Sequence, residues 1–125
     1  MSNCPCGSGL DYDNCCGPII AGTTPAPTAE ALMRSRYSAY VKREYAHLRD
    51  TLSEEQREDY SEENTREWAE SAEWLGLTIL QTQGGGPEDD FGIVEFVARF
   101  RAGGREQKHL EAATFGKIDG RWYYT

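Results

Sequence analysis

The sequence predicts an α+β fold, in which helices pack on one face of an antiparallel sheet behind a small cysteine-rich segment. Residues 28–50 carry apolar side chains at helical spacing, whereas residues 75–124 alternate apolar and polar side chains as strands do. Gly-Gly and Asp-Gly pairs separate the alternating runs, as in hairpins. A chain of 125 residues fits one compact domain with a short appendage.

The bulk composition favours a folded protein of the cytoplasm. Hydrophobic residues make up 38% and charged residues 27% of the chain, and its longest apolar run is too short to span a membrane. No charged-then-apolar leader precedes the cysteines, so we expect no export. The net charge of -8 argues against general nucleic-acid binding, because a phosphate backbone attracts Lys and Arg.

All four cysteines lie in the segment CPCGSGLDYDNCC, at Cys4, Cys6, Cys15 and Cys16. Adjacent cysteines rarely bridge one another and a CxC bridge is strained, so two local disulfides are disfavoured. Cross-paired disulfides or redox use remain the alternative, although a redox centre more often shows CxxC. Four thiolates suit tetrahedral zinc with every position filled, so we expect a structural metal site.

The same segment resembles the SEC-C motif, a zinc-binding module found at the end of the SecA translocation ATPase. The resemblance rests on CPCGSG, on Tyr12 three residues before Cys15, and on the final pair Cys15-Cys16. It implies Zn²⁺ with iron as an alternative, and a protein partner for the knuckle. In SecA the intervening segment is lysine-rich and the module binds SecB and the ribosome; here it carries Asp11 and Asp13, so this knuckle is anionic.

The expected organisation is a knuckle with the start of its linker at residues 1–22 and a second domain at residues 28–125. Residues 17–28 hold three of the five prolines and no charge, which indicates a semi-rigid connector. We therefore expect a tethered knuckle whose folding is separable from that of the domain.

A helix is predicted from Thr28, which can cap it, to about residue 50, with a break near Glu44. One arc of this helix is apolar, whereas several basic side chains surround the arc and are expected on a solvated face. The arc consists of Met33, Tyr37, Tyr40, Val41 and Leu48, and the basic residues are Arg34, Arg36, Lys42, Arg43 and Arg49. Ser53 and Gln56 resemble a capping box that begins a further, acidic helical stretch reaching residue 73.

Strands are predicted at about residues 75–83, 91–102, 105–118 and 121–125. The turn GGGPEDD joins the first two, and the pairs Gly103-Gly104 and Asp119-Gly120 close the following hairpins. In the second strand one face is apolar, with Val94, Phe96, Ala98 and Phe100.

The segment APTAEALMRSRYSAYV, the pair His109 and Glu111 ahead of Phe115, and the ending DGRWYY resemble the bacterial YchJ family. The likeness covers nearly the whole chain. It implies a SEC-C knuckle joined to a domain of the nuclear transport factor 2-like fold, a curved sheet that helices wrap into a cone with a pocket. The family has no established activity, so the resemblance implies no reaction.

His109 and Glu111 are two residues apart in a strand, so their side chains share a face. Glu95 and Arg99 share a face of the neighbouring strand, and a His-Glu-Arg cluster on the concave side would suit acid-base chemistry. The competing interpretation is that these charges only stabilise the sheet. His47 and His109 lack ligand-spaced companions, so neither is predicted to bind metal.

From these observations we expect a zinc-binding, adaptor-like protein rather than an enzyme. Its knuckle would dock a protein partner, and its cone domain would hold a small ligand or form a dimer. The alternative is a small-molecule enzyme that uses His109 and Glu111 as an acid-base pair. A deep apolar pocket lined by these two residues favours the enzyme, and a filled or shallow one favours the adaptor. No cofactor beyond the metal is indicated.

Overall fold

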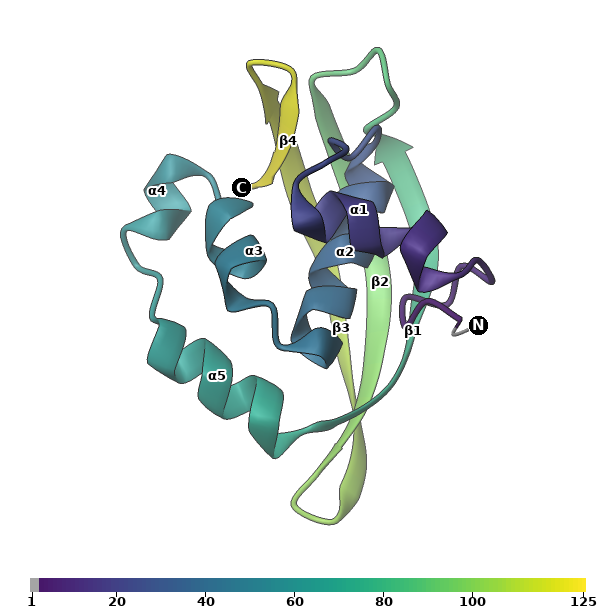
Figure 1. The fold of residues 1–125 in the computed structure, drawn as a ribbon, viewed down its shortest axis with the longest axis vertical. Helices are drawn as coiled ribbons and strands as arrows, with labels where there is room; N and C mark the ends of the chain where they lie inside the picture. The colour runs from purple at the N-terminus through teal and green to yellow at the C-terminus, as the bar shows by residue number, and fades with distance from the viewer. Residues whose placement is uncertain (1–2) are drawn as a thin grey trace.

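The computed structural model describes residues 3–125 and confirms the α+β class (Figure 1). Within these residues, four antiparallel strands form one sheet in the order β1-β2-β3-β4, so each strand pairs with the next along the chain. The strands are β1 (Glu73–Gly84), β2 (Phe91–Ala102), β3 (Arg105–Ile118) and β4 (Arg121–Tyr124). Residues 1–2, where the predicted knuckle begins, lie outside the described part.

The helices precede the strands and cover one face of the sheet, which we call its inner face (Figure 1). They are η1 (Tyr12–Asn14), α1 (Cys16–Ala21), α2 (Ala29–Lys42), α3 (Tyr45–Asp50), α4 (Glu54–Arg57) and α5 (Glu62–Ser71). Helix α2 is the longest, and it packs against β1, β2 and β4. No helix of the described residues is both long and apolar enough to cross a membrane.

The predicted long helix is broken where the sequence indicated. The hydroxyl oxygen of Thr28 accepts a hydrogen bond from the Ala31 amide at 3.0 Å and so caps α2. The helix ends at Arg43, whose φ of 60° lies in the left-handed region, and the chain turns through Glu44 into α3.

Two sequence expectations for the helices need correction. The acidic stretch after Ser53 forms two helices rather than one, because Ser61 caps a second start by accepting from the Asn64 amide at 3.2 Å. The start of the predicted connector is helical, since α1 continues to Ala21 before the left-handed Gly22 ends it. Pro18 stands in the first turn of α1, where the missing amide hydrogen costs no helical bond.

The sheet follows the predicted alternation. Val94, Phe96 and Ala98 of β2 are buried on the inner face, and their neighbours in β3 are Ala113, Glu111 and His109. Register irregularities interrupt the β1–β2 ladder at Trp74/Gly76 and at Ile79/Gln81, and such bulges increase the bend of a strand. Both predicted glycine turns, at Gly103-Gly104 and at Asp119-Gly120, close hairpins.

The knuckle shares the core of the domain, so the expectation of a tethered module is wrong. Cys4, Cys6 and Cys16 belong to the same buried cluster as Leu32 and Phe115. Ile20 of α1 and Ala26 of the following segment pack against that cluster, as does Tyr12. The connector between knuckle and helix α2 is short enough for α1 to fold back onto α2.

Candidate metal centre and cone pocket

The four cysteine sulfurs converge on one point. All four Sγ atoms lie within 4.8 Å of one another. The Sγ atoms of Cys6 and Cys15 are 3.7 Å apart, and those of Cys15 and Cys16 are 3.9 Å apart. A tetrahedron with metal–sulfur bonds of about 2.3 Å has edges of about 3.8 Å, so this donor set fits a four-coordinate metal ion.

Local backbone structure places the sulfurs. The amide of Cys4 donates to the Leu10 carbonyl at 2.8 Å, and that of Gly7 donates to the Cys4 carbonyl at 3.2 Å, which closes a tight loop around the first cysteine pair. Gly7 has a φ of 81°, a conformation in which a side chain is strained. Cys15 follows η1 and Cys16 begins α1, so two short helices present the second pair.

The cysteine site is largely closed to solvent. Cys4, Cys6 and Cys16 are at most 4% exposed, and Cys15 is half-buried with the Ser8 hydroxyl 3.2 Å from its sulfur. A hydrogen bond from the Cys16 thiol lowers the pKa of the Cys6 thiol, and the same bond raises the pKa of Cys16. Burial raises the pKa of Cys15 as well, so without a metal ion the cluster favours a thiolate at Cys6 and protonated thiols at Cys15 and Cys16. A metal ion held by all four sulfurs would displace those protons.

Three contacts join the knuckle to α2. The Cys4 sulfur lies 3.5 Å from the Ser38 hydroxyl, and Arg34 donates from Nη1 to the Cys6 carbonyl at 2.8 Å. The Lys42 ammonium lies 4.7 Å from the centre of the Tyr12 ring. These contacts fix the metal-binding loop on the longest helix of the domain.

A separate cavity of about 220 Å³ lies between α2, α5 and the inner face of the sheet. Most of its lining is aromatic or aliphatic: Met33, Tyr37, Tyr40, Trp68, Trp74, Phe96 and Ala98. Its polar lining consists of Arg36, His109, Glu111 and the hydroxyl-bearing Tyr124. We call it the cone pocket.

His109 and Glu111 lie together in the cone pocket, as their spacing predicted. Nε2 of His109 is 2.8 Å from Oε1 of Glu111, while the Tyr124 hydroxyl donates to Oε2 of the same carboxylate. Burial, followed by the Glu111 hydrogen bond, raises the pKa of Tyr124. Glu111 thus orients a histidine and a tyrosine at once, an arrangement that can position groups for proton transfer.

The predicted His-Glu-Arg cluster does not form with Arg99. In the β2–β3 ladder Arg99 pairs with Lys108, one residue away from His109, so its side chain lies on the opposite face of the sheet. Glu95 pairs with Ala112 and lies on that outer face too. The arginine of the cone pocket is Arg36 of α2, which is only 6% exposed and not on a solvated face as expected.

The sequence carried a signal for Arg36. Leu32 and Met33 precede it by four and three residues, and Ala39 and Tyr40 follow it by three and four. Those positions surround a residue on a helix surface, so Arg36 lies within the apolar arc rather than beside it. For Tyr124 there is no comparable signal, because the sequence of a C-terminal strand does not indicate which side chain lines a pocket.

His47 does not join a metal site. Its Nε2 lies 2.9 Å from the Ser35 hydroxyl, and burial, followed by the nearby charge of Arg36, lowers its pKa to about 4. Among residues 3–125, the four cysteines form the one group of three or more His, Cys, Asp or Glu side chains close enough to hold a metal ion.

Comparison with known proteins agrees with both parts of this architecture. The SEC-C motif matches residues 2–18, and the family described as YchJ, middle NTF2-like domain, matches residues 28–125. A UPF0225 protein of Geobacter sulfurreducens is 51% identical over 126 residues, which cover 100% of this chain and 78% of the relative. A UPF0225 protein of Corynebacterium efficiens is 45% identical over 122 residues, which cover 98% of this chain and 89% of the relative.

Two solved structures have the same fold. The solution structure of a SEC-C motif containing protein from Rhodopseudomonas palustris has a TM-score of 0.91 and 44% identity, over 99% of this chain and 95% of that one. The crystal structure of such a protein from Psychrobacter arcticus has a TM-score of 0.87 and 29% identity, over 99% of this chain and 80% of that one. The chain therefore belongs to the YchJ family, whose curated relatives bear the name UPF0225.

Proposed function

We propose that the protein is a zinc-binding, adaptor-like protein with a ligand-binding cone domain. The observation that carries the metal assignment is the convergence of the four sulfurs, with separations that match the edges of a zinc–thiolate tetrahedron. Cys4, Cys6, Cys15 and Cys16 would be the ligands. Because all four positions are filled by protein sulfur, the metal would stabilise the knuckle and leave no place for a reacting water.

Elemental analysis of the purified protein tests this assignment. We expect one zinc per chain, and a loss of most of it in Cys15→Ser, since one of four ligands is removed. Ser8→Ala is the matched control because it alters the neighbour of Cys15 without removing a ligand. Iron in place of zinc would correct the identity of the metal. A metal content near zero, with four thiols that react in the folded protein, would refute the site.

The outer side of the knuckle is the proposed docking surface for a protein partner. Leu10 is 54% exposed, and Asp11 and Asp13 follow it in the chain, so this surface combines an apolar side chain with negative charge. Such a surface suits a partner with an apolar depression and basic rim. Pull-down from native lysate should retain a protein with the wild type and lose it with Leu10→Ser, which leaves the cysteines intact.

The cone pocket supports the second part of the proposal, and it also favours a second candidate function. The cavity is predominantly apolar and lined by both His109 and Glu111, and these are two of the features that we expected of a small-molecule enzyme. In that candidate, His109 and Glu111 act as an acid-base pair and Tyr124 holds the carboxylate.

Stability measurements on His109→Ala separate a functional role from a structural one. A functional polar side chain seldom stabilises its protein, so we expect the free energy of unfolding to fall by less than about 1 kcal/mol. A fall of roughly 3 kcal/mol or more is typical of a broken buried network and would assign His109 a structural role.

A further inference from the structure

Arg36 is a buried charge with only part of its hydrogen-bonding capacity in use. Its Nη1 donates to the Leu48 carbonyl at 2.8 Å and to the Thr51 hydroxyl at 2.6 Å. The guanidinium carbon lies 4.9 Å from the centre of the Tyr124 ring, so the planar group also rests on an aromatic face. These contacts hold the guanidinium in one orientation at 6% exposure.

The other edge of the guanidinium has no hydrogen-bond partner among the described residues. An arginine has five N–H donors, of which two are on Nη1 and three are on Nε and Nη2. Within residues 3–125 no hydrogen bond uses these three donors, and no carboxylate lies within 4.0 Å of Arg36. The one fully enclosed side-chain polar atom without a partner in that range is Nε1 of Trp122, so the unpaired nitrogens of Arg36 are not fully enclosed by protein.

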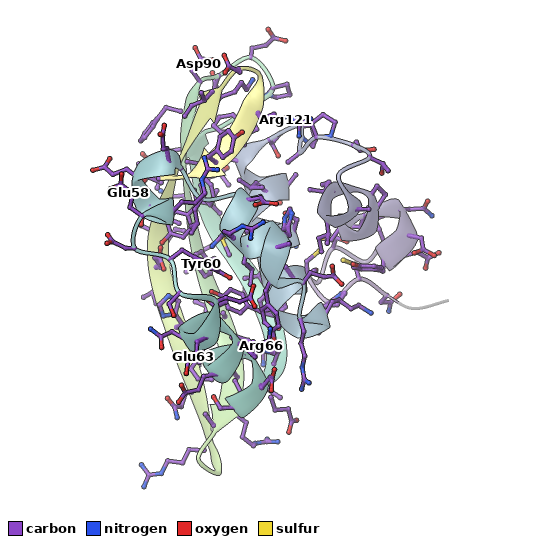
Figure 2. The ribbon with its side chains drawn as sticks, turned by 60° about the vertical axis from the view of Figure 1, so that its left-hand side comes forward. Glu58, Tyr60, Glu63, Arg66, Asp90 and Arg121 are labelled. Carbon is purple, nitrogen blue, oxygen red and sulfur yellow. The ribbon has the colours of Figure 1, made fainter. Side chains whose placement is uncertain are left out.

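Two cavities adjoin Arg36, and the cone pocket is one of them. The other, of about 280 Å³, is lined by Arg36 and Tyr40 together with Tyr60, which Figure 2 shows in the segment between α4 and α5. A buried cation without an anion is costly, and arginine is seldom buried unless it is paired. An anionic group in the space beside Arg36 would remove that cost.

Glu111 does not supply that anion directly. Each of its carboxylate oxygens already accepts a hydrogen bond, Oε1 from His109 and Oε2 from Tyr124. The Glu111 carboxylate is therefore held by His109 and Tyr124. Among the described residues, it forms no ion pair with Arg36. The pocket thus contains the Glu111 carboxylate, both of whose oxygens accept hydrogen bonds, and the Arg36 guanidinium, some of whose donors have no partner.

The size and walls of the cone pocket define the rest of the ligand. An apolar cavity of about 150 Å³ is enough to bind benzene, so the volume of about 220 Å³ found here accommodates one ring with a short substituent. Trp68, Trp74 and Tyr40 contact one another with ring centres 5.4 Å apart and form a continuous aromatic wall. Such a wall packs well against a flat ring.

We propose that the cone pocket binds a small planar aromatic carboxylic acid, with its ring on the aromatic wall and its carboxylate on the Nε–Nη2 edge of Arg36. The fork of this edge matches the two oxygens of a carboxylate. This assignment rests on the proposed role of the cone domain as a ligand scaffold, and it adds the chemical class of the ligand.

Binding of benzoate and of benzamide to the zinc-loaded full chain tests the proposal. The two probes have the same ring and nearly the same shape, but only benzoate carries a charge. We expect benzoate to shift the amide resonances of residues around Arg36 and Glu111 in a saturable way, and benzamide to bind at least tenfold more weakly, because hydrogen bonds to a charged group are the stronger ones. This comparison needs no variant.

Arg36→Met should then weaken benzoate binding at least tenfold and leave benzamide binding unchanged. Arg101→Met is the matched control: it removes the same charge from an exposed arginine of β2 and should leave both affinities unaltered. Equal binding of the two probes to the wild type, or benzoate binding that survives Arg36→Met, would overturn the acid assignment while the ligand scaffold stands. If neither probe binds at millimolar concentration, both the acid assignment and the scaffold fail.

Discussion

The buried charge of Arg36 helps to keep the neighbouring His47 imidazole unprotonated. His47 lies on α3 beside Ser35, and Arg36 follows Ser35 on α2. Burial and the Arg36 charge both disfavour a second cation, which is why the pKa of His47 falls to about 4. In an unfolded chain the same imidazole titrates near its ordinary value of about 6.5.

This difference predicts a pH dependence of stability. Above about pH 6.5 the imidazole is neutral in both states and costs nothing. As the pH falls from 6.5 towards 4, the unfolded chain binds a proton that the folded one does not, so stability is lost. Between pH 7 and 5 the loss attributable to His47 should be at most about 2 kcal/mol. Urea unfolding at both pH values measures it.

His47→Gln provides the control, since glutamine can still bond to the Ser35 hydroxyl but does not titrate. Its unfolding free energy should fall less between pH 7 and 5 than that of the wild type. The proposed metal site would respond to acid in both proteins, so only the difference between them reports on His47. An identical acid response in wild type and variant would show that His47 is not the group responsible.

At the scale of the elements, the start of α2 is hydrogen-bonded to the loop of the β1–β2 hairpin. The Ala29 amide donates to the Gly85 carbonyl at 2.9 Å, so the hairpin loop receives the first turn of the helix. At Gly92 a Cβ atom would lie 2.5 Å from the Gly85 Cα and 3.3 Å from the Ala29 Cβ. The absence of a side chain at Gly92 therefore permits the contact between helix and hairpin.

Gly92→Ala should destabilise the protein by about 2 kcal/mol, because neither backbone nor helix can move aside without cost. Gly116→Ala is a matched control in the adjacent strand, where the nearest atom, the Thr125 Cγ2, is 3.4 Å from the added carbon. It should change stability by less than about 0.5 kcal/mol. Thermal unfolding of both variants checks the difference, and equal effects would contradict the packing argument.

The strands and the shared face of His109 and Glu111 could be predicted because a period of two depends only on neighbours in the chain. The break at Glu44 was predictable too, whereas the second start at Ser61 was hidden in a stretch of uniformly acidic residues. The contacts that hold the knuckle were not predictable. Arg34 and Cys6 are 28 residues apart, and a pattern of neighbouring residues cannot predict a contact over that separation.

At the scale of the whole molecule, knuckle and domain form one hydrophobic core. Removal of the metal should therefore destabilise the sheet as well as residues 3–22. We expect a strong chelator to lower the main melting temperature by more than about 5 °C, which corresponds to roughly 1 kcal/mol for a domain of this size. Calorimetry with and without chelator measures the shift.

Arg34→Met tests the route of this coupling, because it removes the hydrogen bond from α2 to the Cys6 carbonyl and keeps an unbranched side chain. The variant should show a smaller shift on chelation than the wild type. A main transition that chelation leaves in place, with loss of signals confined to residues 3–22, would show that the knuckle unfolds independently of the domain despite the shared core.

The uneven burial of the four cysteines has a chemical consequence. Cys4, Cys6 and Cys16 are buried, so Cys15 is the sulfur that a dissolved oxidant or alkylating agent meets first. Once that sulfur is modified, three thiolates would remain to hold the proposed metal ion, and the ion would dissociate more readily. The lifetime of the metal under oxidative stress would then depend on how well one serine hydroxyl, that of Ser8, covers one sulfur.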